Sequence, residues 1–206
     1  MRVLHLLPII MIVTAFGCAG MNPNPGERSA DMAWERGDYN RAHSFIRPAA
    51  ERGEPWAQLR LGVAYELGIG VPRNLQEAIF WYKKAALQMA PGEWAEGKII
   101  GATGEPGYFN QNSDALIAQH QLANIYLRGD GVQKDLIEAY LLEKNVSDET
   151  KGRDLFYCCE FSNPRFITAN DIAKTLHGIE MMMTINERKI AEEKLKAWRS
   201  LQRRER

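Results

Sequence analysis

The sequence predicts an all-α fold made of repeated helix pairs, and three observations support this prediction. A segment that begins at Trp56 recurs 61 residues further along the chain. Within it, Ala57, Leu61 and Tyr65 follow one another at steps of four, so they would lie on one face of a helix. Glycines come soon after this face, and they would end the helix and allow a tight reversal into a second one.

The two copies agree at matched positions along both predicted helices. Asn74 and Asp135 precede the second helix of each copy, where we expect them to act as N-caps. The small residues of the pattern would let neighbouring helices approach closely, while the aromatic rings fill the gaps. The first copy contains Ala57, Leu61, Gly62, Tyr65, Gly68, Gly70, Ala78, Trp81, Tyr82 and Ala85, and the second contains Ala118, Leu122, Tyr126, Gly129, Gly131 and Ala139.

A shift of 36 residues towards the N-terminus aligns Ala78 with Ala42, which adds a partial copy before the first full one. The repeat period is therefore 36 residues, and an insertion of 25 residues displaces the last copy. The full pattern is A-Q-x-x-L-G-x-x-Y-x-x-G-x-G-V-x-x-N/D-x-x-x-A-x-x-W-Y-x-x-A-A, and it is similar to the Sel-1-like repeat family, which is related to the tetratricopeptide repeats. The resemblance implies a short right-handed α-solenoid of helix-turn-helix repeats, in which the motif residues are structural.

We expect the chain to be organised as a leader, a tether and one repeat array with a C-terminal capping helix. The later repeat has Leu142 and Glu143 where the family has Trp-Tyr, so we expect its second helix to pack differently. The predicted parts are a signal peptide (1–17), a flexible tether (18–28) and the array (29–206), which divides into a partial repeat (30–53), a repeat (54–88), a loop insertion (89–113), a repeat (114–145) and a divergent helical cap (146–206).

Two capping-box patterns define the helices of the cap. Thr168 with Asp171 predicts a helix that runs to about residue 182, and Thr184 with Glu187 predicts a second, charged helix after it. A charged terminal helix would stop the repeats from stacking further. The expected apolar stripe of the second helix consists of Ile185, Ile190, Leu195 and Trp198.

The first residues have the features of an export signal. Arg2 is the only formal charge before Glu27, and the apolar stretch after it is shorter than the roughly 20 residues of a membrane-spanning helix. Residues 14–20 resemble a bacterial lipobox, in which Cys18 is lipidated and becomes the new N-terminus. This resemblance implies a lipoprotein on the periplasmic side of the outer membrane, because the residue directly after Cys18 is not Asp. A soluble periplasmic protein is the alternative.

The composition excludes several classes of function. Lys and Arg total 26, as do Asp and Glu, and this neutral balance disfavours nucleic-acid binding and leaves the lipid as the expected membrane contact. Three cysteines are too few for a disulfide scaffold or a four-cysteine zinc site. The sequence contains no H-E-x-x-H, G-x-S-x-G or Walker motif. We therefore predict no catalytic residue, no metal and no cofactor.

The insertion is the predicted partner-binding site. A loop longer than about 12–15 residues in a compact fold is usually functional or disordered, and this one carries Trp94, Tyr108 and Phe109. Aromatic residues are enriched at interface hot spots, although these three could instead fasten the loop to the repeats. His120 is a further candidate. Because it aligns with Leu59, a packing position, a core or groove role is the alternative for it.

The expected function is that of an adaptor that binds another protein. Helical repeat arrays offer extended concave surfaces for this purpose. The family resemblance implies a non-enzymatic, periplasm-facing adaptor, and small exported members include immunity proteins that neutralise lipase-type effectors. The alternative is an adaptor of envelope or cell-wall assembly that binds a glycan or an assembly enzyme.

Overall fold

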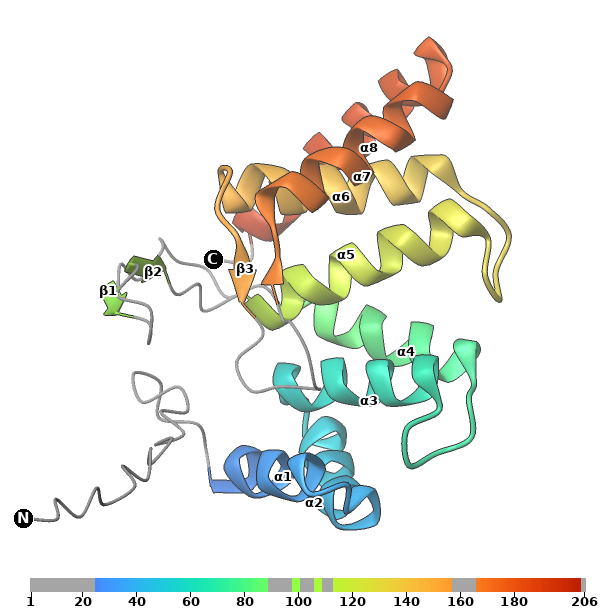
Figure 1. The fold of residues 1–206 in the computed structure, drawn as a ribbon. Coiled ribbons are helices and arrows are strands. Elements are labelled where there is room, and N and C mark those ends of the chain that lie inside the picture. Colours follow the sequence, from blue (N-terminus) through green and yellow to red (C-terminus); the bar gives the residue numbers. More distant parts are fainter. Residues whose placement is uncertain (1–24, 89–97, 101–105, 109–112, 157–165, 205–206) are drawn as a thin grey trace, which may run out of the picture.

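The computed structural model describes residues 25–88, 98–100, 106–108, 113–156 and 166–204. Within these ranges the chain forms eight helices and two short antiparallel strand pairs, and helix dominates, as predicted (Figure 1). The helices are α1 (Pro25–Glu35), α2 (Tyr39–Glu51), α3 (Pro55–Leu67), α4 (Leu75–Ala86), α5 (Ser113–Arg128), α6 (Leu136–Thr150), α7 (Ala169–Met182) and α8 (Ile185–Arg204), and the strands are β1 (Lys98–Ile100), β2 (Pro106–Tyr108), β3 (Leu155–Phe156) and β4 (Phe166–Ile167).

The first six helices form three antiparallel pairs that stack in sequence order (Figure 1). Within the pairs, α1 packs on α2, α3 on α4 and α5 on α6, while α2 packs on α3 and α4 on α5 between them. This succession is the α-solenoid that the sequence predicts. Its interior divides into a cluster around Trp34, Trp56 and Trp81 and a second cluster around Tyr82, Leu116 and Leu122.

Side-chain caps begin the second helix of each of these pairs. The carboxylate of Asp38 accepts a hydrogen bond from the backbone of Arg41 at the start of α2. Asn74 accepts two backbone bonds at the start of α4, and Asp135 accepts two at the start of α6. These caps satisfy N–H groups that the helices themselves cannot, and they confirm the predicted roles of Asn74 and Asp135.

The glycines of the repeat loops have left-handed backbones, and Gly70 and Gly131 also lie against the preceding repeat. Gly68 ends α3 with φ 73°, and Gly129 has the equivalent φ of 77° after α5. A Cβ atom on Gly70 would lie 2.5 Å from the Cβ of Tyr39, and one on Gly131 would lie 2.9 Å from that of Leu75. Both the conformation and the close contact require glycine.

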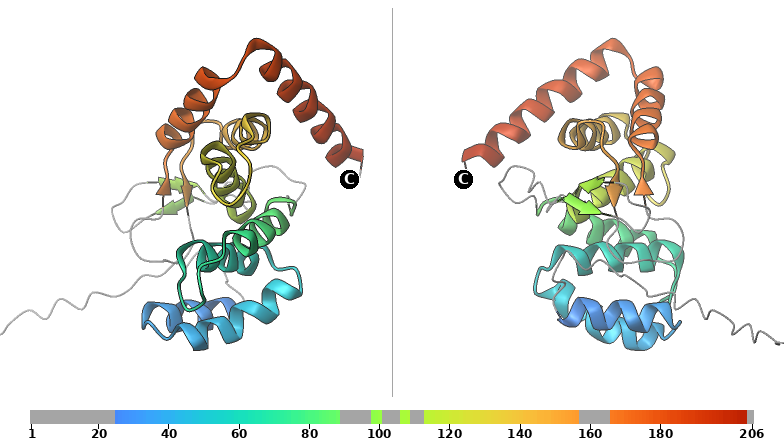
Figure 2. Two further views of the ribbon diagram at one scale, coloured as in Figure 1. Left: turned by 90° about the vertical axis from the view of Figure 1, so that its right-hand side faces the viewer. Right: turned by 60° about the vertical axis from the view of Figure 1, so that its left-hand side comes forward.

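The cap departs from the repeat geometry. Thr168 and Asp171 form the predicted capping box, and α7 ends at Met182 as expected. However, α7 and α8 meet at a sharp turn and both pack on α6, which lies between them (Figure 2). Ala191 and Leu195 form the buried side of α8, whereas Ile185 and Ile190 are 92% and 44% exposed. The predicted apolar stripe was therefore wrong for those two isoleucines.

Two local predictions also need correction. Helix α1 begins at Pro25, so the last four residues of the predicted tether (18–28) are helical. The insertion, expected to be a loop, contains the antiparallel pair of β1 and β2, and the cap, expected to be helical, contains that of β3 and β4. Among the helices that the structure describes, none combines the length and apolar character needed to cross a membrane.

Candidate functional site

Buried glutamines join each full repeat to the helix pair before it. The Gln58 side chain on α3 donates to the backbone carbonyl of Ala50 at 3.1 Å, and Gln119 on α5 donates to that of Ala86 at 3.0 Å. Both glutamines are at most 3% exposed. Each carbonyl belongs to the last turn of the preceding helix, and that of Ala50 also accepts a bond from the backbone N–H of Gly53 at 3.0 Å. The inner helices α3 and α5 are thereby fixed in register.

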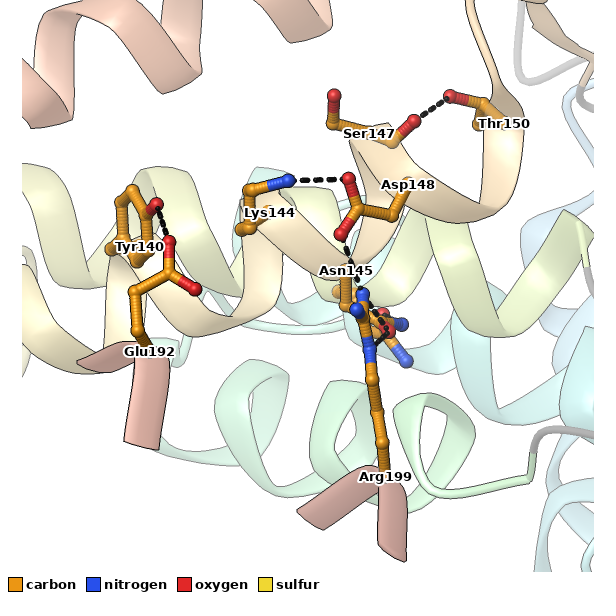
Figure 3. Close-up of polar contacts among 9 residues, drawn as sticks. Tyr140, Lys144, Asn145, Ser147, Asp148, Thr150, Glu192 and Arg199 are labelled. Atoms are coloured by element: carbon orange, nitrogen blue, oxygen red, sulfur yellow. Dashed lines mark hydrogen bonds and ion pairs between the residues drawn. The ribbon is translucent and has the colours of Figure 1, made fainter. Parts of the chain in front are cut away.

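The side chains of these two glutamines also accept hydrogen bonds from their own repeats. Gln88, just after α4, donates its amide to the Oε1 atom of Gln58 at 2.7 Å, and Asn145 on α6 donates to that of Gln119 at 2.8 Å. In the last repeat the network continues, because Arg199 on α8 donates to Asn145 Oδ1 at 3.2 Å (Figure 3). A continuous polar network therefore runs from α4 to α8.

Further polar contacts fasten α8 to α6. Arg199 also contacts Asp148 Oδ2 at 2.9 Å, and Lys144 bonds the other oxygen of the same carboxylate (Figure 3). Burial alone would raise the pKa of Asp148, but these two cations lower it below its usual value. The hydroxyl of Tyr140 donates to Glu192 at 2.6 Å. Burial and this acceptor raise the pKa of Tyr140, so it stays protonated.

A buried arginine lies among carboxylates where α1, α3 and α5 meet. Arg60 on α3 is 5% exposed at its side chain. Its guanidinium contacts Asp31 at 2.6 Å and Glu27 at 3.4 Å, both on α1, and it lies 4.8 Å from the ring centre of Trp56. Asp114, in the first turn of α5, interacts with the same charge.

Two of these carboxyl groups have a raised pKa. Burial raises the pKa of Glu27 from 4.5 to about 7, and repulsion from Asp114 and Asp31 adds to this effect, although Arg60 opposes it. Burial likewise raises the pKa of Asp114. Glu27 therefore titrates near neutral pH, well above the range of an exposed carboxyl group.

His120 and Glu143 form a further buried polar group. Glu143 stands where the preceding repeat has the aromatic residue Tyr82. His120 Nδ1 lies 2.9 Å from Glu143 Oε2, and the amide nitrogen of Asn124 lies 3.0 Å from His120 Nε2. These contacts fit an imidazole that donates from Nδ1 and accepts at Nε2. Burial raises the pKa of Glu143, while the bond from His120 acts in the opposite direction. The different packing expected of this repeat is therefore confirmed at Glu143.

Of the four predicted partner-binding side chains, the structure describes only that of His120. His120 is 8% exposed and paired within the fold, so it takes the core role rather than a surface role. Tyr108 lies in β2, but its side chain is outside the described residues, as are Trp94 and Phe109. Cys18 is outside them too. The binding role of the three aromatic residues stays a prediction.

Some of these contacts had a sequence signal and others did not. Gln58 and Gln119 recur at the shift of 61, so their repetition could have predicted the shared bond. Glu27 and Arg60 carry no such signal, because they are far apart in sequence and Glu27 lies before the repeated pattern. No cluster of three or more potential metal-ligating side chains occurs within the parts of the chain that the structure describes.

Taken together, the stacked helix pairs and their inter-repeat bonds define a helical-repeat scaffold. Residues 57–88 and 116–142 match the Sel1 repeat family model. These two stretches of the chain are therefore similar to Sel1 repeats, and proteins with such repeats act as scaffolds for protein–protein interactions.

Individual proteins match short stretches of this chain. A chitin synthase regulator of Saccharomyces cerevisiae is 46% identical over 57 residues, which are 28% of this chain and 8% of that protein. DAP3-binding cell death enhancer 1 of Rattus norvegicus is 44% identical over 49 residues, or 24% of this chain and 10% of that protein. The chain thus matches only a small part of these relatives' length.

A solved structure shares the overall fold. It is a protective antigen present in uropathogenic Escherichia coli strains, described as displaying an SLR fold. The match has a TM-score of 0.53 and 22% sequence identity, and it covers 82% of this chain and 28% of the antigen. At this identity the comparison supports the solenoid fold and carries no functional detail.

Proposed function

We propose that this protein is an adaptor that binds another protein through the insertion at 89–113. One observation supports this site: the fold holds both ends of the insertion firmly. On one side, Gln119 bonds the carbonyl of Ala86 at the end of α4. On the other side, α5 begins at Ser113, and Asp114 belongs to the buried charge cluster around Arg60. Binding segments are commonly loops that a rigid scaffold positions in this way.

The proposal includes export and lipid anchoring at Cys18. The described fold begins at Pro25, seven residues after Cys18, so a lipid there would keep the repeats close to a membrane. The test is labelling of the full chain with a fatty-acid analogue in a Gram-negative host. We expect label in the wild type and none in Cys18→Ser, and an unlabelled wild type would contradict anchoring.

The specific role that we propose is immunity, meaning that the protein neutralises a lipase-type effector delivered into the periplasm. A short anchored array would hold an inhibitor beside a membrane-attacking enzyme. The support is the family resemblance together with the lipobox. The purified protein should form a stoichiometric complex with such an effector and block its lipid hydrolysis.

A second candidate is an adaptor of envelope or cell-wall assembly. The observation that favours it is the yeast relative, whose name describes a regulator of a polysaccharide-synthesising enzyme. Under this alternative the partner is an assembly enzyme or a glycan, and a lipase-type effector would not bind.

Affinity capture from an envelope extract tests the binding site. The full chain is compared with a variant in which a Gly/Ser linker replaces 89–112, and with Phe80→Ala, which changes an exposed ring on α4. We expect the linker variant to lose the main partner and Phe80→Ala to keep it. Retention of that partner by a folded linker variant would refute the proposed site.

A further inference from the structure

The charge cluster around Arg60 connects three helices of the fold. Glu27 and Asp31 come from α1, the first described helix; Arg60 comes from α3; and Asp114 comes from α5, directly after the insertion. The side chains of Arg60, Asp31 and Glu27 are 5%, 13% and 16% exposed. Water therefore screens their interactions only weakly.

We propose that this cluster is a pH-sensitive joint, which holds α1 against α3 and α5 more tightly in mildly acidic than in mildly alkaline solution. The inference is independent of the partner and of lipid attachment. It rests on the distances and burial of Arg60, Asp31 and Glu27, and on the interaction of Asp114 with Arg60 and Asp31.

The distances show which carboxylate of α1 lies closer to Arg60. Asp31 lies 2.6 Å from the guanidinium and is its closest acidic partner, whereas Glu27 lies 3.4 Å away. Among the described residues, the charged groups that face Glu27 are Asp31 on its own helix, Arg60 on α3 and Asp114 on α5. An ionised Glu27 is repelled by the charges of Asp114 and Asp31, and its contact with Arg60 opposes this repulsion. A protonated Glu27 removes that repulsion.

The direction of the pH effect follows from the pKa of Glu27. Its pKa is about 7 in the folded protein and 4.5 without these surroundings, so the docked helix binds the proton more tightly than the undocked one. This contribution to docking is complete below pH 4.5 and is lost as the pH rises through 7. The raised pKa of Asp114 acts in the same direction.

The joint has a local consequence because α1 also contributes to the core. Ala30, Ala33 and Trp34 are buried against α2 and α3, so α1 stays folded onto the array at alkaline pH. What changes is how often it opens. Between pH 6 and 8.5 we expect opening of α1 to become about tenfold more frequent. At pH 6, one unit below the pKa of Glu27, protonation favours the docked helix about tenfold, and at pH 8.5 this preference is lost.

Hydrogen–deuterium exchange of the full chain at pH 6.0 and 8.5 tests this inference. Protection of α1 amides, corrected for intrinsic exchange and divided by that of α4, should fall about tenfold at the higher pH. Glu27→Gln, which is uncharged at both values, should remove most of this fall. Glu35→Gln, an exposed change on the same helix, should keep it.

Two results would overturn the proposal. One is a wild-type protein in which the ratio of α1 to α4 protection is equal at both pH values. The other is a Glu27→Gln protein in which this ratio still falls tenfold at pH 8.5. Asp114→Asn serves as a second variant should Glu27→Gln not fold, and it should reduce the change. An undiminished change in Asp114→Asn would then count against the joint.

Discussion

A Cβ atom at Gly62 would overlap the ring of Tyr82, so these two residues fit together only because Gly62 has no side chain. Tyr82 is fully buried between α3 and α4, and its hydroxyl donates to Glu66 at 2.7 Å. In the following repeat, Glu143 stands at the position of Tyr82. The same joint between paired helices is thus built once from an aromatic ring and once from a buried polar pair.

We predict that Gly62→Ala destabilises the protein by about 1–3 kcal/mol, because the added methyl group overpacks the contact with the Tyr82 ring. Urea denaturation followed by circular dichroism measures the free energy of unfolding. Gly178→Ala is the matched control, since that helical glycine on α7 has open space around its Cβ position. It should be neutral or stabilising by up to about 1 kcal/mol. Equal losses in both variants would contradict the close contact.

Gln119→Ala should cost about 1–3 kcal/mol, because it leaves the carbonyl of Ala86 and the amide of Asn145 without this buried partner. Chemical denaturation again provides the measurement. Gln133→Ala, at an exposed loop position, should change the free energy of unfolding by less than about 0.5 kcal/mol. If both variants unfold like the wild type, Gln119 does not hold the repeats together.

The pair of His120 and Glu143 should show strong coupling in a double-mutant cycle. Glu143→Leu alone leaves the buried imidazole without its carboxylate, and we expect a loss of about 2–4 kcal/mol. Adding His120→Leu removes the polar group as well, so the double variant should be more stable than Glu143→Leu alone. A double variant whose loss equals the sum of the single losses would show that the two residues act independently.

Arg199→Ala should loosen α8 with a small effect on global stability. Its contacts with Asn145 and Asp148 are partly exposed, so we expect a loss of at most about 1 kcal/mol. Hydrogen exchange should report faster opening in α8 but not in α4. Lys196→Ala, an exposed change on the same helix, should leave α8 protection unaltered. Unchanged α8 exchange in Arg199→Ala would mean that apolar packing alone holds this helix.

The repeat period predicted the parts of the fold that depend on local chemistry. The caps at Asn74 and Asp135 and the left-handed turns at Gly68 and Gly129 follow from residue type and spacing, and the structure confirms the caps and the turns. Such features need no knowledge of distant contacts, and this explains why a single sequence sufficed for them.

The features that sequence patterns missed depend on tertiary contacts. The start of α1 was assigned to the tether because Pro25 and Gly26 are poor helix formers, yet proline suits the first turn and Trp34 is buried by the fold. The stripe through Ile185 and Ile190 was predicted from spacing alone, whereas contact with α6 decides which side of α8 is buried. Strands β3 and β4 have two residues each, too few for any alternation to be visible.

The dissociation constant of the captured partner tests the central claim most directly. Calorimetric titration compares the full chain with a variant in which Trp94, Tyr108 and Phe109 are all changed to Ala, and thermal unfolding verifies that both are folded. We predict binding at least about tenfold weaker in the variant, since hot-spot aromatics each contribute about 1–2 kcal/mol or more. An unchanged dissociation constant, with unchanged thermal unfolding, would contradict an adaptor that binds through its insertion.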